Sequence, residues 1–141
     1  MDESNEVTEI RDRKRQRLLE SLEGGGTAVD GGETAPTEPI HIEGAAHLDE
    51  VTGTYDVVLV DFYADWCGPC QMLEPVVREL ARETAAAVAK VDIDRHQAIA
   101  QQAGIRGVPT LFVYADGELR ERLVGVQDPG RLQNLIDRYA A

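Results

Sequence analysis

The chain has only two cysteines among its 141 residues, Cys67 and Cys70. Two thiols cannot staple a disulfide-rich scaffold, and one C-x-x-C pair supplies only half of the ligands of a structural zinc site. The three histidines, His41, His47 and His96, lack the spacing of metal ligands, so we expect no metal site. A thiol pair that cycles between dithiol and disulfide survives these exclusions.

Lysines and long apolar runs are also scarce. Only Lys14 and Lys90 are lysines, and 26 acidic residues against 14 basic residues give a formal net charge of -12. Such a surface resembles that of halophilic proteins, whose salt-loaded cytoplasm screens self-repulsion; an ordinary acidic protein is the alternative. Residues 1–23 are crowded with charge, so we expect neither a secretory signal nor a membrane span, and therefore a cytoplasmic protein.

Composition divides the chain into three parts. Residues 1–23 are predicted to form a charged helix, because residues 5–23 contain neither Gly nor Pro. Residues 24–38 are rich in Gly, Thr, Glu and Pro, which predicts a flexible linker before a folded domain over residues 39–141. The basic stretch 11–17 has the composition of a nucleic-acid contact, but a solvated helix face is the simpler interpretation, and we expect no nucleic-acid partner.

Hydrophobic patterning predicts alternating strands and helices in the folded domain. Strands are expected over residues 40–42, 57–63, 86–93, 108–114 and 118–124, and helices over 45–51, 72–84, 95–103 and 128–139. Asp94 and Asp128 are expected to cap helices, and the Asp116–Gly117 step predicts a hairpin. The order predicts an α/β fold in which helices flank a central sheet of mixed direction.

Cys67 and Cys70 lie where a buried strand ends and a helix begins. At that position the two sulfurs lie one turn apart, close enough to join without moving the backbone. Unpaired backbone N–H groups and the helix dipole favour the thiolate of Cys67, whereas Cys70 is expected to be less exposed and protonated at rest. We therefore expect Cys67 to attack a substrate disulfide and Cys70 to resolve the mixed disulfide.

One carboxylate, Asp61, interrupts the apolar run 57–63. Burying a carboxylate is costly and raises its pKa, which would suit a group that exchanges protons. From the residues alone, a solvent-facing strand position is an equally good interpretation of Asp61.

Several segments resemble the thioredoxin family in composition and order. They are VDFYADWCGPC, AKVDID, GIRGVPTLFVY and LVGV, together with the Asp-Gly hairpin. The resemblance covers residues 39–141 and implies the thioredoxin fold and a monomeric protein-disulfide reductase without a bound cofactor. Its implied partners are a thioredoxin reductase and proteins that contain disulfides. Gly68-Pro69 resembles the reducing members, since oxidases and isomerases of this fold usually place His before the second cysteine.

The resemblance also implies roles for residues outside the cysteine pair. Asp61 matches the buried family aspartate that deprotonates the resolving cysteine, and Lys90 matches the lysine that moderates the charge of that aspartate. For Lys90, a strand lysine that extends its amine to solvent is the alternative. Pro109 aligns with the family's cis-proline, which leaves the backbone of Val108 free to pair with an extended substrate. An ordinary trans proline that opens a strand is the alternative for Pro109.

A small apolar rim around Cys67 is expected to dock protein substrates transiently. Its expected members are Trp66, Gly68, Pro69, Val108, Gly125 and Val126, and core packing is the alternative for Trp66. Tyr63 departs from the family pattern, because many members carry a second tryptophan there, and we expect this to alter packing rather than redox chemistry. An alternative function is a thioredoxin-fold binding or chaperone module that is recruited through the N-terminal helix.

Overall fold

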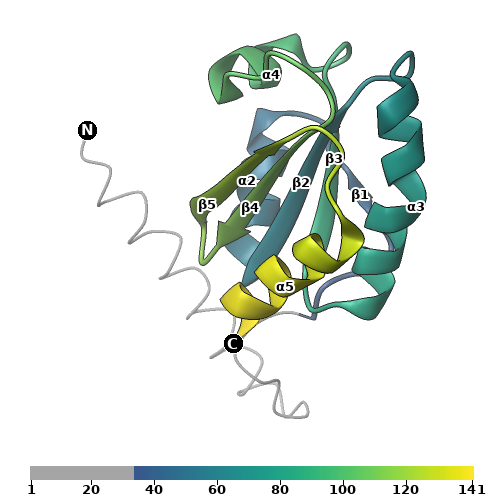
Figure 1. Cartoon of the computed structure of the whole chain (residues 1–141). Coiled ribbons are helices and arrows are strands. Elements are labelled where there is room, and N and C mark those ends of the chain that lie inside the picture. Colours follow the sequence, from purple (N-terminus) through teal and green to yellow (C-terminus); the bar gives the residue numbers. More distant parts are fainter. Residues whose placement is uncertain (1–33) are drawn as a thin grey trace.

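The structure is a computed structural model that describes residues 34–141, which form a sheet with helices on both sides (Figure 1). The elements in chain order are β1 (Ile40–His41), α2 (Ala45–Thr54), β2 (Val57–Tyr63), α3 (Gly68–Glu83), β3 (Ala87–Asp92), α4 (Gln97–Ala103), β4 (Thr110–Ala115), β5 (Glu118–Val124) and α5 (Pro129–Ala140). This order confirms the predicted succession of strands and helices. The helix predicted within residues 1–23 and most of the predicted linker lie outside the described residues.

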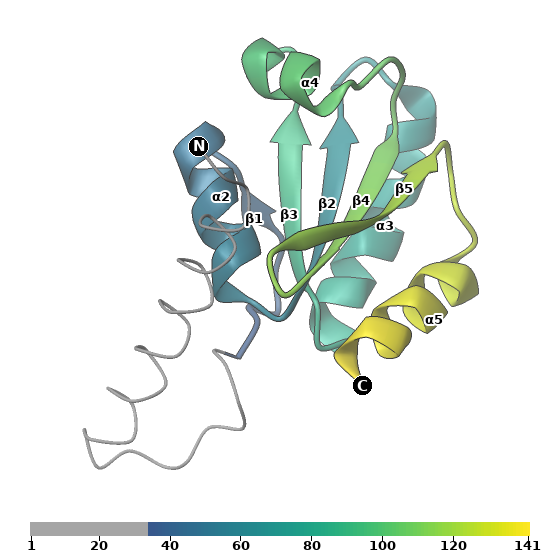
Figure 2. The same cartoon turned by 90° about the vertical axis from the view of Figure 1, so that its left-hand side faces the viewer.

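The five strands form one sheet in the order β1-β3-β2-β4-β5 (Figure 2). β1, β3 and β2 are parallel, whereas β4 is antiparallel to β2 and β5 is antiparallel to β4. The predicted sheet of mixed direction is therefore confirmed. The two parallel connections pass through helices, as strand pairs of that direction require.

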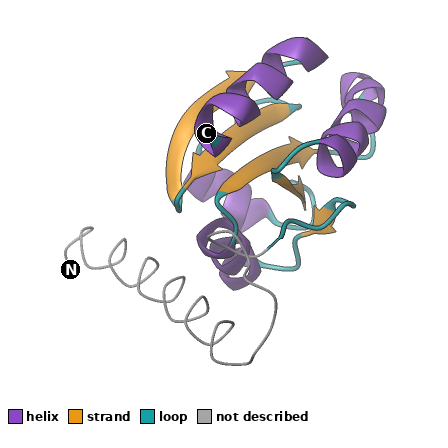
Figure 3. Ribbon diagram, turned by 90° about the horizontal axis from the view of Figure 1, so that it is seen from below, coloured by secondary structure: helices purple, strands orange, loops and turns teal. Residues whose placement is uncertain are grey.

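Two apolar clusters cover the two faces of the sheet. Figure 3 shows the sheet between its helices. On one face, side chains of α3 and α5 pack against the strands; the helical members are Leu73, Val77, Leu80, Ala81, Leu132, Leu135 and Ile136. On the other face, Val51 of α2 and Ile99 of α4 pack against strand residues such as Phe62 and Phe112. Because both faces are covered, the central strands must be apolar on both sides.

β2 and β3 occupy the centre of this arrangement and end at the same edge of the sheet. Every residue of β3 is buried, as are all residues of β2 except the half-buried Tyr63. The register of the two strands places Asp61 beside Lys90, so a carboxylate and an amine interrupt the core at one level. Beyond this pair, the chain leaves β2 and enters α3 after a short turn. The cysteines therefore lie at the edge of the sheet where β2 ends.

Helix α3 begins at Gly68, four residues earlier than the patterning predicted. Pro69 is compatible with this start, because a helix needs no N–H from its first turn. The hairpin prediction is confirmed, since Asp116 and Gly117 adopt φ values of 54° and 80° between β4 and β5. The predicted cap of α5 is also confirmed, because a carboxylate oxygen of Asp128 accepts a hydrogen bond from the Arg131 N–H.

The predicted cap of the fourth helix by Asp94 is wrong. α4 begins at Gln97 and its N-cap position is occupied by His96, whose side chain makes no capping hydrogen bond. The Asp94 carboxylate instead accepts a hydrogen bond from the Trp66 indole N–H at 2.9 Å. A partner 28 positions away in the chain has replaced the local one, which no local pattern could indicate.

Residues 34–38 form no regular element, but Ala35 packs against the cluster that includes Val51. The last residues of the predicted linker therefore contact the folded domain. Within the described range 34–141, no helix combines the length and the apolar character needed to cross a membrane.

Candidate active site

Cys67 and Cys70 are joined by a disulfide at the start of α3, with their Cα atoms 5.3 Å apart. Cys67 is the N-cap residue, and its sulfur accepts a hydrogen bond from the Cys70 N–H at 3.1 Å. A tight turn aims this sulfur, because the Cys67 N–H donates to the carbonyl of Ala64 at 3.1 Å. An N–H group and a helix N-terminus directed at a sulfur stabilise negative charge on it, so this geometry favours a Cys67 thiolate when the disulfide is reduced.

The expected difference in exposure between the two cysteines is not present in the disulfide form. Cys67 is 4% exposed and Cys70 is 5% exposed. Both sulfurs pack with Ala64 and Val108 in a small apolar cluster, and the bond between them holds Cys70 as near the surface as Cys67. Asymmetry between the sulfurs therefore comes from their helix positions rather than from burial.

The loop before β4 lies against the disulfide. The Cys67 sulfur is 3.7 Å from the Val108 carbonyl oxygen, and the Val108–Pro109 peptide bond is cis, as the resemblance implied. The Pro109 carbonyl accepts a hydrogen bond from the Gly125 N–H at 2.8 Å. Gly125 has φ of 87°, a conformation that residues with a Cβ rarely adopt. This glycine therefore lets the turn after β5 reach the proline loop.

The residues predicted for the rim around Cys67 differ in exposure. Trp66 is 70% exposed and Val126 is 51% exposed, and Gly68 and Pro69 are exposed as well. Val108 and Gly125 are half-buried, whereas Pro109 is buried beneath them. The structure adds two exposed apolar side chains in adjoining segments that the sequence reasoning did not select, Met72 at 71% and Val124 at 74%. Their place in amphipathic segments gave no signal that they would remain uncovered.

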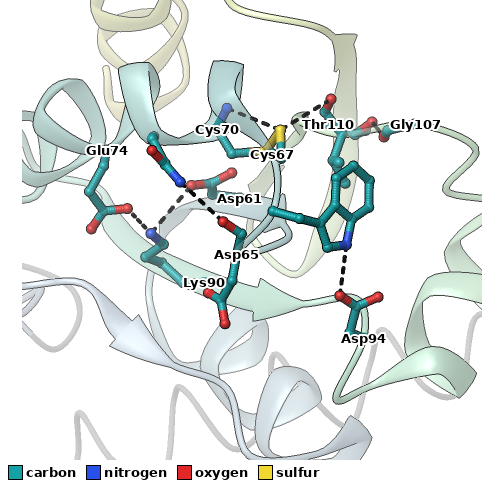
Figure 4. The surroundings of a disulfide bond; sticks show 12 residues. Asp61, Asp65, Cys67, Cys70, Glu74, Lys90, Asp94, Gly107 and Thr110 are labelled. Atoms are coloured by element: carbon teal, nitrogen blue, oxygen red, sulfur yellow. Dashed lines mark hydrogen bonds and ion pairs between the residues drawn. A yellow bond between two sulfur atoms is a disulfide. The ribbon is translucent and has the colours of Figure 1, made fainter.

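Asp61 lies beneath the disulfide and is 1% exposed (Figure 4). Burial raises its pKa from 3.8 to about 6, although the positive charge of Lys90 acts in the opposite direction. Within residues 34–141, no group donates a hydrogen bond to its Oδ1 atom. A buried carboxylate with one unpartnered oxygen and this pKa can take up and release a proton near neutral pH.

Lys90 is 4% exposed, and its amine lies 3.9 Å from Asp61 Oδ2. The same amine makes a direct ion pair with Glu74, a residue of α3 that the sequence reasoning missed. Glu74 follows Cys70 by four positions, and this one-turn spacing on the helix is the signal that would have found it. The alternative in which Lys90 extends its amine into solvent does not match this burial.

The histidines and carboxylates do not gather as metal ligands in the part of the chain that the structure describes. Residues 34–141 contain no group of three His, Cys, Asp or Glu side chains suitably placed for a metal ion. His47 accepts a hydrogen bond from the Glu43 N–H at 3.0 Å, so its Nδ1 atom already has a partner.

Comparisons with known proteins agree with this geometry. The family model described as thioredoxin matches residues 38–138. The thioredoxin of Chlamydia caviae is 44% identical over 85 residues, which cover 60% of this chain and 83% of that protein. Thioredoxin 1 of Synechococcus elongatus is 40% identical over 97 residues, which cover 67% of this chain and 91% of that protein.

A solved structure of a Halobacterium protein is also similar. A mutant thioredoxin from Halobacterium salinarum NRC-1 superposes with a TM-score of 0.74 and 57% identity, covering 78% of this chain and 97% of that chain. The acidic, lysine-poor composition of this chain fits such a neighbour.

Proposed function

The chain belongs to the thioredoxin family, and from this premise we propose that Cys67 is its attacking sulfur and Cys70 its resolving sulfur. Thioredoxins are thiol–disulfide oxidoreductases, and the joined Cys67–Cys70 pair fits that activity. The family implies a thioredoxin reductase as electron donor and disulfide-containing proteins as substrates. The observation that carries the proposal is the Cys67 sulfur at the N-cap of α3, where the Cys70 N–H donates to it.

The reaction proceeds by two exchanges at the Cys67 sulfur. The Cys67 thiolate attacks one sulfur of the substrate disulfide, forming a mixed disulfide and releasing the other substrate sulfur as a thiolate. Cys70 then loses its proton and attacks Cys67, which forms the intramolecular disulfide and releases the second substrate thiolate. Asp61 accepts the Cys70 proton, and Lys90 moderates the negative charge that Asp61 carries before it does so.

Substrate docks on the rim around Cys67. The exposed Trp66 and Val126 with Gly68 and Pro69 offer a small apolar patch suited to transient contact with many proteins. Val108 pairs through its backbone with an extended substrate segment, and Pro109 and Gly125 hold that loop in place. The Gly68-Pro69 dipeptide favours the reducing direction over oxidation or isomerisation.

The setting of the protein is part of the proposal. It acts as a monomer in the cytoplasm, without contact to membranes or nucleic acid, and its activity resides in a domain over residues 39–141. Residues 1–23 and the linker 24–38 add a charged segment to that domain. The alternative, a binding or chaperone module recruited through this segment, predicts that the dithiol is dispensable.

Substitution of the attacking sulfur tests the function. Cys67→Ser should lower the rate of reduction of a test protein disulfide by at least about a thousandfold, because the nucleophile is lost. Cys70→Ser should attack at the same site but accumulate a mixed disulfide with the substrate, visible by non-reducing electrophoresis. Reduction by Cys67→Ser at the wild-type rate would contradict the proposal, and full complementation of a thioredoxin-deficient strain by Cys67→Ser would favour the binding module.

A further inference from the structure

Three side chains from α3 and β2 lie close to the Lys90 amine, and Figure 4 shows two of them, Glu74 and Asp61. The amine makes a direct ion pair with Glu74 of α3, lies 3.9 Å from Asp61 Oδ2 of β2, and lies 4.2 Å from the centre of the Tyr63 ring. An ammonium over an aromatic face is attracted by the ring quadrupole, so Tyr63 also holds the amine. Two carboxylates therefore compete for one buried cation.

Of the two carboxylates, Glu74 is the one that pairs directly with the Lys90 amine. Its direct contact with the amine contrasts with the 3.9 Å separation of Lys90 and Asp61, which is too long for a hydrogen bond. Asp61 Oδ1 has no hydrogen-bonding group against it within residues 34–141. The buried acid thus keeps both oxygens outside hydrogen-bonding distance of the nearest cation, although that cation is its neighbour in the β2–β3 register.

We propose that Glu74 is a positioning residue, which holds the Lys90 amine away from Asp61 and thereby keeps the Asp61 carboxylate available to accept the proton of Cys70. The inference rests on the proposed role of Asp61 in the resolving step. The other carboxylate oxygen of Glu74 lies 3.9 Å from Arg78 Nε, one turn further along α3, so its direct contact is with Lys90. The Glu74 side chain is 36% exposed, so it remains in contact with solvent while it pairs with the buried amine.

A cleft of about 350 Å³ connects these groups to solvent. The residues that line it are Tyr63, Ala64, Asp65, Cys70, Gln71, Glu74 and Lys90. The resolving sulfur, the amine and the positioning carboxylate therefore share one opening.

The charged and titratable groups that act on Asp61 and on its neighbours Lys90 and Tyr63 come from several elements. Lys90 acts on Asp61, Asp65 acts on both Lys90 and Tyr63, Asp92 and Arg95 act on Tyr63, and Glu74 pairs with Lys90. Burial is the main cause that raises the pKa of Asp61 to about 6, and Lys90 is the charge that lowers it. A closer approach of Lys90 would lower the Asp61 pKa further.

The step that Glu74 supports is the second exchange. The Cys70 thiol gives its proton to the Asp61 carboxylate, and the resulting thiolate attacks the Cys67 sulfur of the mixed disulfide. The Cys67–Cys70 bond forms as the bond between Cys67 and substrate breaks, and the departing substrate thiolate takes a proton from Asp61 or solvent. A more basic Asp61 removes the Cys70 proton more readily, so a fall in its pKa slows this step.

Glu74→Gln tests the inference in two measurements. In the disulfide form, where the sulfurs do not titrate, carbon-13 NMR of the Asp61 carboxyl should show its titration midpoint lowered by about one unit as Lys90 approaches. Reduction of a protein disulfide at pH 7 should slow by about threefold, and its pH profile should shift in the same direction. The KM for the substrate should remain unchanged, because Glu74 lies outside the docking rim.

Two controls separate this effect from general loss of charge. Glu79→Gln removes the same charge from an exposed position further along α3, and it should leave both the Asp61 midpoint and the rate unchanged. Lys90→Met removes the cation that Glu74 holds. Adding Glu74→Gln to Lys90→Met should therefore shift the Asp61 midpoint by much less than Glu74→Gln shifts it alone.

The outcomes distinguish the inference from the proposed function. If the titration midpoint of Asp61 in Glu74→Gln is unchanged or raised, the role proposed for Glu74 is wrong. This holds even if slow disulfide reduction by Asp61→Asn supports the proposed proton transfer. Reduction by Asp61→Asn at the wild-type rate would instead overturn the proposed proton transfer, and the role of Glu74 with it.

Discussion

Asp61 and Asp92 are buried aspartates near the carboxyl ends of adjacent parallel strands, but their surroundings differ. Asp92 is 8% exposed, and its Oδ1 accepts hydrogen bonds from the N–H groups of Asp94 and Arg95 at 2.9 and 3.4 Å. Asp61 is 1% exposed and has one oxygen without a donor among residues 34–141. The first carboxylate shapes the turn into α4, whereas the second is left with capacity to exchange a proton.

Burial alone therefore does not mark a proton-transfer group. A buried carboxylate that accepts backbone N–H groups stabilises the fold, because those groups would otherwise lose their partners. A buried carboxylate without such donors costs stability whenever it is charged. Substitutions at the two positions should therefore act in opposite directions.

The largest effect should follow Asp61→Asn. The raised pKa of Asp61 means that the folded state binds a proton more tightly than the unfolded state. The stability that this proton adds to the fold is complete below about pH 4 and is lost as the pH rises past about 6. Removing the charge should raise the free energy of unfolding at pH 8 by about 3 kcal/mol. Urea unfolding of the disulfide form between pH 4 and 8 measures this, and a less stable variant at pH 8 would contradict the comparison.

Asp92→Ala should have the opposite sign. Loss of the acceptor leaves two backbone N–H groups unpaired, and the free energy of unfolding should fall by about 2 kcal/mol. Asp92→Asn keeps an acceptor oxygen and should lose less. Both proteins should reduce disulfides at the wild-type rate at temperatures where they are folded, and a slow Asp92→Asn would show that this carboxylate also takes part in proton transfer.

Deletion of the N-terminal segment should have the smallest effect on stability and activity, because both aspartates lie in the folded domain. Removal of residues 1–33 should change neither the unfolding free energy nor the rate of reduction. Removal of residues 1–38 also takes away Ala35, which packs against the cluster that includes Val51, and should cost about 1 kcal/mol or less. Loss of activity in either protein would place the domain boundary further toward the N-terminus.

Much of the fold was predictable from the sequence because its signals are local. The apolar run over residues 57–63 could be satisfied only by a strand covered on both faces, and β2 spans that range. Asp116–Gly117 and Asp128 carry turn and cap chemistry in their own side chains and backbone, so the hairpin and α5 begin where expected. Asp94 failed because the Trp66 indole, distant in sequence, supplies its partner.

Only part of the candidate site could be predicted from local signals in the sequence. The cysteine pair and its place at a helix start follow from the spacing and from the apolar run that precedes it. The spacing from Cys70 could have indicated that Glu74 lies near the cysteines, but nothing in the sequence indicated that Glu74 and Tyr63 would both contact the Lys90 amine. Their meeting depends on how α3 lies over the β2–β3 pair, and that arrangement is set by packing across the whole sheet.

The sequence by itself determined the order of strands and helices, the redox pair and the family of this protein, because each is encoded in residues close together along the chain. Only the tertiary structure decided which carboxylate pairs with the Lys90 amine and which buried aspartate has an oxygen without a donor among residues 34–141. Electrostatic interactions depend on distances across separate elements, and those distances exist only after the sheet and its helices have packed.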